Sequence, residues 1–143
     1  MRPKTTVEMK PKSVIFLLIL FVISACSQVA ITGRENIFKN KTFVHLYFET
    51  EEECIASQPE PDFFYNCHQQ LDFLKDNRVQ IMLTDIFWIG EYKLEGGTIV
   101  LTFKPNNEIP NGEIIFEILN PTKLLRTDDR TIWKKMNGNS IYN

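Results

Sequence analysis

Apolar and polar residues alternate along most of the chain after residue 42. In one such run, Val79, Ile81 and Leu83 alternate with more polar neighbours such as Arg78 and Gln80. This period of two is typical of a β-strand with one buried face. The same pattern predicts further strands over residues 43–48, 70–74, 90–94, 99–103, 113–119, 124–125 and 132–134.

Short turn signals separate the predicted strands. The paired glycines Gly96 and Gly97 permit the positive φ angles of a tight hairpin. Further turns are expected at residues 76–77, 120–121 and 127–130, and a longer loop is expected over 105–112. No stretch after residue 42 shows helical periodicity, although residues 63–73 have room for a helical turn. Strands joined by such tight turns are antiparallel.

The number and order of these strands indicate the fold class. We predict an all-β fold, a small antiparallel meander barrel or half-barrel of about seven or eight strands. Closure of the sheet removes its exposed edges. A barrel of about eight strands has room inside for packed side chains or for one small ligand.

The first 25 residues have a different pattern. A basic segment over residues 2–12 precedes an unbroken apolar run of 10 residues, Val14–Ile23. A helix that crosses the hydrocarbon core of a bilayer needs about 20 apolar residues, so this run is too short to span a membrane. The arrangement is typical of a secretory signal peptide over residues 1–25.

The apolar run ends in Ile23-Ser24-Ala25-Cys26. This sequence resembles the lipobox of bacterial lipoproteins, in which a branched aliphatic residue and two small residues precede a cysteine. The resemblance implies that Cys26 receives a diacylglyceryl group, that a peptidase cuts before it, and that the membrane is a partner through this lipid. The alternative is a plain secretory signal with a coincidental cysteine, whose cleavage would place Ile23 or Gln28 where small residues are preferred.

The segment that follows Cys26 bears on location and domain organisation. Ser27 in place of aspartate implies, by resemblance to enterobacterial lipoproteins, an anchor in the outer membrane, with the domain facing the periplasm or the surface. Residues 26–41 are mostly polar and are expected to form the lipidated cysteine and a flexible tether. Residues 42–143 are expected to form a single β domain, because about 100 residues suffice for one core.

Charge narrows the set of partners. The whole chain carries a formal net charge of −2 and residues 1–25 carry +3, so the remainder carries −5. A domain of that charge has no electrostatic footprint for nucleic acid or for anionic lipid headgroups. We therefore expect no nucleic-acid partner.

Two cysteines remain once Cys26 is lipidated. In an oxidising compartment, Cys54 and Cys67 are expected to form a disulfide. They enclose an acidic, proline-bearing segment that is predicted to be an irregular loop, which a cross-link would order. Two free thiols are one alternative, and a metal site that adds His68 and His45 is another. Because the spacing matches no paired-cysteine motif, we expect no metal.

Motifs for catalysis are not found in the sequence. It contains no Ser-His-Asp order, phosphate-binding glycine loop or HExxH motif, so we expect neither an enzyme nor a cofactor. His45 shares a predicted strand face with Tyr47 and is interpreted as a packed or surface residue, and His68 as part of a solvated loop. Most aromatic residues are expected to fill the core. Residues 63–65 are all aromatic and cannot all face inward on one strand, so an exposed patch is expected there.

The C-terminal part of the chain carries a second resemblance. Residues 90–103, followed by 124–125 and 128–135, look like the C-terminal half of small lipocalin-like bacterial lipoproteins. In those proteins a G-x-Y-x-hydrophobic-x-G pattern and a late W-K pair recur, and the resemblance implies a β-barrel. The paired-cysteine motif of copper-resistance lipoproteins and the Ser-rich loop of periplasmic lysozyme inhibitors are absent, so neither activity is implied.

These observations lead to three functional hypotheses. The first is a non-enzymatic lipoprotein whose barrel serves as a binding or interaction module in the cell envelope, with an envelope protein as its partner. The second is a carrier of a small apolar ligand inside the barrel, as in lipocalins. The third is an enzyme, which the lack of a catalytic motif makes the weakest.

Overall fold

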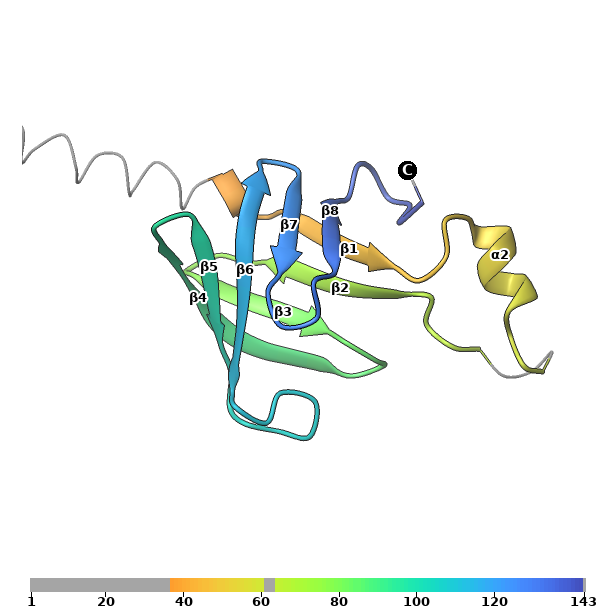
Figure 1. Cartoon of the computed structure of the whole chain (residues 1–143), viewed down its shortest axis with the longest axis horizontal. Coiled ribbons are helices and arrows are strands. Elements are labelled where there is room, and N and C mark those ends of the chain that lie inside the picture. The colour runs from red at the N-terminus through yellow and green to blue at the C-terminus, as the bar shows by residue number, and fades with distance from the viewer. Residues whose placement is uncertain (1–36, 61–63, 143) are drawn as a thin grey trace, which may run out of the picture. The chain divides into compact units, whose positions relative to one another are not determined.

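A computed structural model describes residues 37–60 and 64–142 of the chain. The expected signal peptide over residues 1–25, the expected lipid attachment site Cys26 and the tether as far as residue 36 lie outside the described residues. Within the described part, eight strands form a closed barrel in chain order, and each strand pairs with the next (Figure 1). All of these pairings, including that between the first and last strands, are antiparallel. The predicted antiparallel meander barrel is therefore confirmed.

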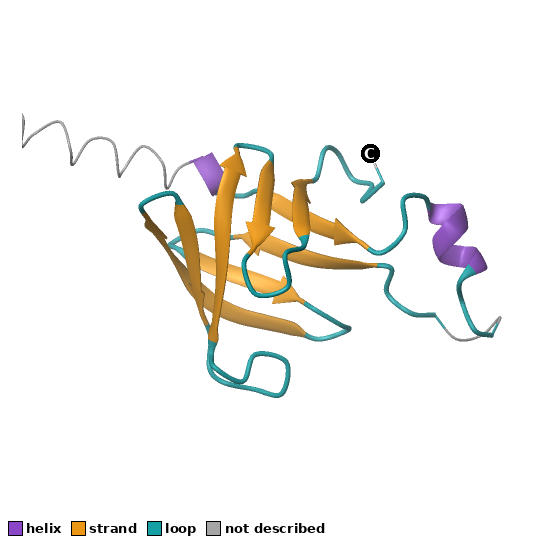
Figure 2. Ribbon diagram, viewed as in Figure 1, coloured by secondary structure: helices purple, strands orange, loops and turns teal. Residues whose placement is uncertain are grey.

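The strands follow the alternating segments of the sequence (Figure 2). Their bounds are β1 (Thr42–Leu46), β2 (His68–Phe73), β3 (Arg78–Met82), β4 (Phe87–Glu95), β5 (Thr98–Thr102), β6 (Glu113–Asn120), β7 (Lys123–Arg126) and β8 (Ile132–Lys135), and the helix α2 (Glu51–Ala56) lies between β1 and β2. Strand β4 begins earlier than the sequence pattern predicts, because Phe87 and Trp88 already pair with β3. None of the described helices is long and apolar enough to cross a membrane.

Two hairpin turns show why the chain reverses where the sequence predicts it. Gly96 and Gly97 join β4 to β5 with φ angles of +58° and +105°. Asp76 and Asn77 are the last two residues of the connection 74–77 between β2 and β3, and their φ angles are +58° and +56°. Two-residue hairpin loops favour positive φ because it matches the twist of the flanking strands, and glycine, asparagine and aspartate tolerate it best.

Alternate residues of the strands point into the barrel and form its core. The largest fully buried side chains are Trp133, Phe38, Phe43, Phe73, Phe116, Leu71, Ile81, Ile99, Leu101, Leu124 and Val79. Their aromatic rings pack edge to face in several places, as between Phe116 and Trp133, whose centroids lie 5.3 Å apart. The middle of the barrel is therefore filled by side chains.

Phe38 extends this core beyond the predicted domain boundary. It is 1% exposed, and its ring centroid lies 5.2 Å from that of Phe73 and 6.0 Å from that of Phe43. The amide of Asn40 donates a hydrogen bond to the carbonyl of Phe73 at 2.8 Å. Residues 37–41, which the sequence analysis assigned to the tether, therefore belong to the packed domain, because an aromatic ring here covers the apolar end of the barrel.

The two ends of the barrel differ in their connections. The end covered by Phe38, which we call the base, has the short turns 74–77, 96–97 and 121–122. The opposite end, which we call the mouth, has the longer connections 47–67, 83–86, 103–112 and 127–131. Binding residues concentrate on loops that a rigid scaffold holds in place. The mouth is therefore the end to search for a site.

Helix α2 was not expected, because the sequence shows no helical periodicity after residue 42, and it covers only the first two residues of the enclosed segment that was predicted to be an irregular loop. The hydroxyl of Thr50 accepts a hydrogen bond from the amide of Glu53 at 3.2 Å, and the Glu53 carboxylate accepts one from the amide of Glu49 at 3.0 Å. The acidic first turn also complements the positive end of the helix dipole. A threonine followed three residues later by glutamate is a capping-box pattern, so the sequence did contain the signal. The helical turn considered for residues 63–73 does not form where β2 occupies His68–Phe73.

Candidate binding site at the barrel mouth

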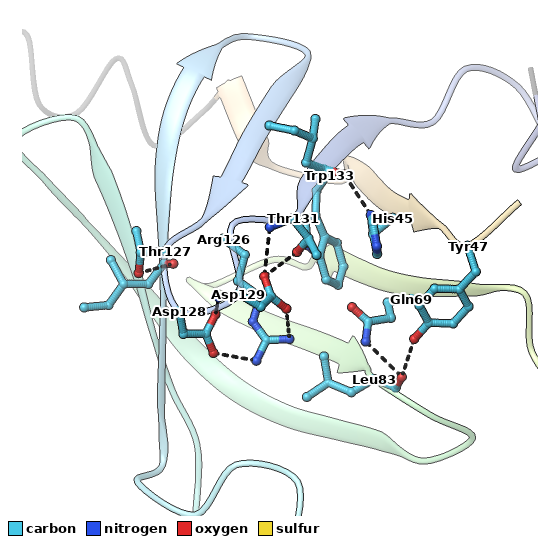
Figure 3. Close-up of polar contacts among 12 residues, drawn as sticks. His45, Tyr47, Gln69, Leu83, Arg126, Thr127, Asp128, Asp129, Thr131 and Trp133 are labelled. Carbon is cyan, nitrogen blue, oxygen red and sulfur yellow. Dashed lines mark hydrogen bonds and ion pairs between the residues drawn. The ribbon is translucent and has the colours of Figure 1, made fainter. Parts of the chain in front are cut away.

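Polar side chains replace apolar ones at the inward positions nearest the mouth. His45 follows Phe43 by two residues in β1 and lies opposite Gln69 in β2. Arg126 follows Leu124 by two residues in β7. Because side chains in a strand alternate between its faces, these polar residues share the inner face with the core. They form a polar layer above the apolar interior (Figure 3).

The turn between β7 and β8 holds a guanidinium group against two carboxylates. Nη2 of Arg126 lies 2.7 Å from an oxygen of Asp128, and its Nη1 lies 3.3 Å from an oxygen of Asp129. The other oxygen of Asp129 accepts hydrogen bonds from the amide and the hydroxyl of Thr131, at 2.9 and 2.6 Å. These contacts fix the turn and with it the position of the Arg126 side chain.

The protonation state of Asp129 follows from its burial and from its contacts with Thr131 and Arg126. Burial by itself raises the pKa of this carboxyl group, since the charged form is partly desolvated. The hydrogen bonds from Thr131 and the positive charge of Arg126 act in the opposite direction and prevail, so the pKa lies below its usual value. Asp129 is therefore a carboxylate at neutral pH.

Two polar atoms of this layer are buried without a hydrogen-bond partner among the described residues. One is Nε of Arg126, whose side chain is 12% exposed. The other is Oε1 of Gln69, whose amide nitrogen donates to the carbonyl of Leu83 at 3.2 Å. A buried polar atom left unpaired costs about 1–3 kcal/mol. A ligand that offered an acceptor to Arg126 and a donor to Gln69 would relieve that cost.

The hydroxyl of Tyr47 interacts with groups from several parts of the mouth. Its hydroxyl donates to the carbonyl of Leu83 at 3.4 Å. Burial raises the pKa of this hydroxyl, a hydrogen bond with Gln69 and the charge of Arg126 lower it, and the carboxylates of Asp129 and Glu108 raise it. The net direction is upward, so Tyr47 is neutral at physiological pH. The groups that act on this one hydroxyl come from four different parts of the chain.

His45 is a packed residue, as its strand position indicates. Its Nδ1 lies 3.1 Å from the carbonyl of Ile132, to which it donates when the ring carries a proton there. Its ring stacks on that of Trp133 at a centroid distance of 6.2 Å and meets the edge of Tyr47 at 5.6 Å. The imidazole therefore bridges β1 and β8 at the level of the polar layer.

The loop 103–112 adds another carboxylate to the mouth. The indole nitrogen of Trp88 donates to one oxygen of Glu108 at 3.0 Å, and the hydroxyl of Thr84 donates to the other. The side-chain oxygen of Asn106 accepts the amides of Glu108 and Ile109, both at 2.9 Å, and so orders this part of the loop. Glu108 thus adds a carboxylate to those of Asp128 and Asp129 at the mouth.

An apolar rim borders the polar layer. Its members are Phe64, Tyr65, Ile86, Phe87 and Ile89, which are between 47% and 69% exposed. Asn66 joins the two segments of this rim, because its side-chain nitrogen donates to the carbonyl of Thr84 at 3.0 Å and to Asp85 at 2.7 Å. The exposed patch expected at residues 63–65 is present at Phe64 and Tyr65, while Phe63 lies outside the described residues.

The disulfide stabilises the longest connection of the mouth. Cys54 and Cys67 are bonded, with their Cα atoms 5.8 Å apart, which confirms the predicted pair. The side chain of Gln58 reinforces the link, since it donates to the carbonyl of Cys54 at 3.0 Å and accepts the amide of Tyr65 at 2.7 Å. This bond ties α2 to the start of β2.

The residues considered for a metal site are arranged differently from that hypothesis. The disulfide consumes both thiols, so Cys54 and Cys67 are not available as thiolate ligands. His68 is the first residue of β2 and is half-buried, which corrects the expectation of a solvated loop. Burial lowers the pKa of its imidazole, and a hydrogen bond with Gln70 opposes this only in part. Within the described ranges, no three His, Cys, Asp or Glu side chains are grouped for a metal ion.

Sequence reasoning did not single out Gln69, Arg126, Asp129 or Glu108. For Gln69 and Arg126 a signal exists, because each continues the inward register of a strand whose other inward residues are apolar. A polar residue at such a position indicates the open end of a barrel. Asp129 and Glu108 lie in loops, and only the folded chain brings them to the mouth.

Comparison with known proteins finds no matching family model, no matching curated protein and no matching solved structure. The eight-stranded antiparallel barrel is the part of the lipocalin-like resemblance that the structure shows.

Proposed function

We propose that this chain is a non-enzymatic lipoprotein of the bacterial cell envelope that holds a partner protein at the mouth of its barrel. The observation that carries the proposal is the pair of buried, unpartnered atoms at the mouth, Oε1 of Gln69 and Nε of Arg126. Native proteins pair nearly all such atoms. A bound partner that pairs both would account for them.

The apolar rim supports a protein as the partner. Interfaces between proteins have aromatic and aliphatic anchors next to polar groups that fix orientation. Phe64 and Tyr65 supply exposed aromatic surface beside the polar layer. The carrier hypothesis has less support, because large side chains such as Phe116 and Trp133 occupy the middle of the barrel.

The proposed lipid anchor at Cys26 is supported by the lipobox resemblance of residues 23–26. The chain enters the barrel at its base, where Phe38 and Asn40 contact Phe73. Cleavage after residue 25 and lipidation of Cys26 are part of this proposal.

Photo-crosslinking in the envelope tests the use of the mouth. A photoreactive phenylalanine analogue at Tyr47 should give a discrete protein adduct, whereas the same analogue at the exposed Lys93 of β4 should not. The variant Gln69→Met removes the unpaired acceptor, together with the hydrogen bond from the Gln69 amide to the carbonyl of Leu83, and should weaken the adduct. Its matched control is Gln70→Met, at the neighbouring position on the outer face of β2.

Equal adducts from Tyr47 and Lys93, or an adduct that survives Gln69→Met unchanged, would contradict the use of the mouth. Native mass spectrometry of residues 27–143 separates the second hypothesis. A lipid that copurifies in stoichiometric amount would favour the carrier over the interaction module.

A further inference from the structure

Two lysines lie opposite each other on the outer surface of the barrel. Lys123 of β7 and Lys134 of β8 are Cα partners, and both are exposed. The amide of Lys135 donates a hydrogen bond to the carbonyl of Thr122 at 2.8 Å, next to this pair. The pair is therefore of the non-hydrogen-bonded kind, in which opposite side chains lie closest together. Like charges at such positions destabilise a sheet.

Neither lysine has an ion-pair partner within the described part of the chain. The ion pairs found there join Arg126 to Asp128 and Asp129. The two lysines thus keep an uncompensated positive charge, although residues 26–143 as a whole carry −5. Exposed charges more than about 8 Å away are largely screened at physiological salt. The local charge, rather than the net charge of the domain, therefore decides what binds at this pair.

An apolar groove of about 1060 Å³ adjoins the lysine pair, and both lysines line it. Val44 of β1 is the Cα partner of Lys134, so its side chain lies on the same outer face of the sheet. Further apolar lining comes from Leu46, Phe48, Ile132, Met136 and Ile141. Tyr142 also lines the groove, and its hydroxyl is buried without a hydrogen-bond partner among the described residues.

We infer that this groove binds a lipid with an anionic headgroup on the outside of the barrel. The headgroup lies between Lys123 and Lys134, where its negative charge offsets their repulsion and accepts charge-assisted hydrogen bonds. The hydrocarbon chain lies along the apolar lining, because removal of apolar surface from water is favourable. The volume of the groove is similar to the upper end of the range of about 300–1000 Å³ for small-molecule sites.

The groove and the mouth adjoin at β1. His45 and Tyr47 border both of them. The lysine pair, however, lies on the outer face of the sheet, whereas Arg126 continues the inner face of β7. The inference therefore goes beyond the function proposed above, which concerns the inner face at the mouth.

The shared face of the lysines and the apolar lining favours a lipid over an acidic peptide. An amphiphile presents its charge and its chain to the same face of a sheet. Successive side chains of an extended peptide point to opposite sides, so a segment that alternates charged and apolar residues cannot contact both sets. Strand β1 also offers a peptide no continuous edge, since it pairs with β2 on one side and with β8 on the other.

The test uses the disulfide-bonded chain from residue 27 onward, which contains the whole closed barrel. The probe is a short-chain, monomeric phosphatidylglycerol, and binding is measured by calorimetry. We expect saturable binding that weakens about tenfold or more in Lys123→Gln/Lys134→Gln, because charge-assisted hydrogen bonds are lost. The control Lys75→Gln/Lys93→Gln removes two exposed positive charges elsewhere and should bind as the native chain does. The lipid should raise the Tm of the native chain and of the control, but not that of Lys123→Gln/Lys134→Gln.

Two further probes separate the headgroup from the chain. Glycerol phosphate carries the anion without the hydrocarbon, and phosphatidylcholine of the same chain length carries the hydrocarbon without net charge. Each should bind about tenfold or more weakly than phosphatidylglycerol, because each lacks one of the two contacts. Gln69→Met should leave lipid binding unchanged, so this test and that of the mouth can fail independently.

Several results would overturn the inference. They are a lack of saturable binding, insensitivity to Lys123→Gln/Lys134→Gln, and equal binding of glycerol phosphate or phosphatidylcholine. Lipid binding that is lost in Gln69→Met but kept in Lys123→Gln/Lys134→Gln would place the lipid at the mouth or inside the barrel. Tighter binding of a soluble peptide rich in glutamate and leucine would assign the groove to an acidic protein segment instead.

Discussion

At the scale of single residues, the mouth combines fixed charges with unused hydrogen-bonding atoms. Asp128 and Asp129 hold the end of the Arg126 guanidinium, yet its Nε stays unpaired. The arginine cannot turn toward a better partner without breaking these contacts. The mouth is thus preorganised, and preorganisation lowers the entropic cost of binding.

Asp129 makes this arrangement sensitive to acid. Its pKa is lower in the folded chain than the value of about 3.9 expected when unfolded, so its stabilising contribution is present above about pH 4 and is lost as pH falls through the folded pKa. Asp129→Asn should lower the free energy of unfolding at pH 7 by less than about 1 kcal/mol, because solvent screens this partly exposed group. Urea unfolding measured at pH 7 and pH 3 tests this. A difference from the native chain that grew toward pH 3 would contradict it.

Gly90 is constrained by close packing between strands. A Cβ atom at this position would lie 2.3 Å from the carbonyl oxygen of Thr102 and 2.6 Å from the ring of Phe103. The absent side chain lets β5, and Phe103 which directly follows it, approach β4 closely. The glycine that begins the G-x-Y pattern therefore has a packing reason in this chain.

At the scale of elements, α2 and the disulfide turn a long connection into an ordered one. Thr50 and Glu53 cap the helix, and Cys54 anchors it to Cys67 at the entrance of β2. The bond closes a loop with a sequence separation of 13 residues. Such a constraint acts mainly on the unfolded chain, which loses conformational freedom.

Removal of the disulfide should therefore destabilise the chain without abolishing the barrel. The paired change Cys54→Ser/Cys67→Ser should lower the free energy of unfolding by about 2–4 kcal/mol, because seven of the eight strands follow Cys67. Denaturant unfolding monitored by circular dichroism measures the loss. Peptide mapping of the native protein without reductant should show the two cysteines linked, and two alkylatable thiols there would contradict the bond.

At the scale of the whole molecule, the barrel has two unlike ends. The base is covered by Phe38 and joined by short turns, and the N-terminal segment enters there. The mouth has the longer loops, the polar layer and the apolar rim.

The proposed anchor has its own test. Cys26→Ala should leave the precursor uncut and without lipid, because the thiol that receives the lipid is lost. Labelling with radioactive palmitate and gel analysis of precursor and mature forms measure both effects. Cys67→Ala serves as the control and should still be labelled. Palmitate incorporation into the Cys26→Ala chain would show that the lipid is attached elsewhere.

Much of the fold followed from local pattern. The alternation in β3 and β5, the glycine pair at 96–97 and the Asp76-Asn77 turn determined strands and connections, because a period of two and positive φ are local properties. The cysteine count, together with the expected export of the chain and lipidation of Cys26, indicated the disulfide. The alternation in β2 and β7 also places Gln69 and Arg126 on the inner face of the barrel. This placement indicates a binding site only once the two ends of the barrel are known.

Only the tertiary structure decided which distant residues meet. Phe38 joined the core because barrel closure left an apolar end to cover, and Glu108 and Asp129 met at the mouth because two loops leave the same end of the barrel. Lys123 and Lys134 became neighbours through the pairing of β7 with β8, which concentrated positive charge in an otherwise acidic domain. Local sequence determines the shape of each strand, whereas these juxtapositions depend on strand order and closure, which involve contacts between residues far apart in the chain.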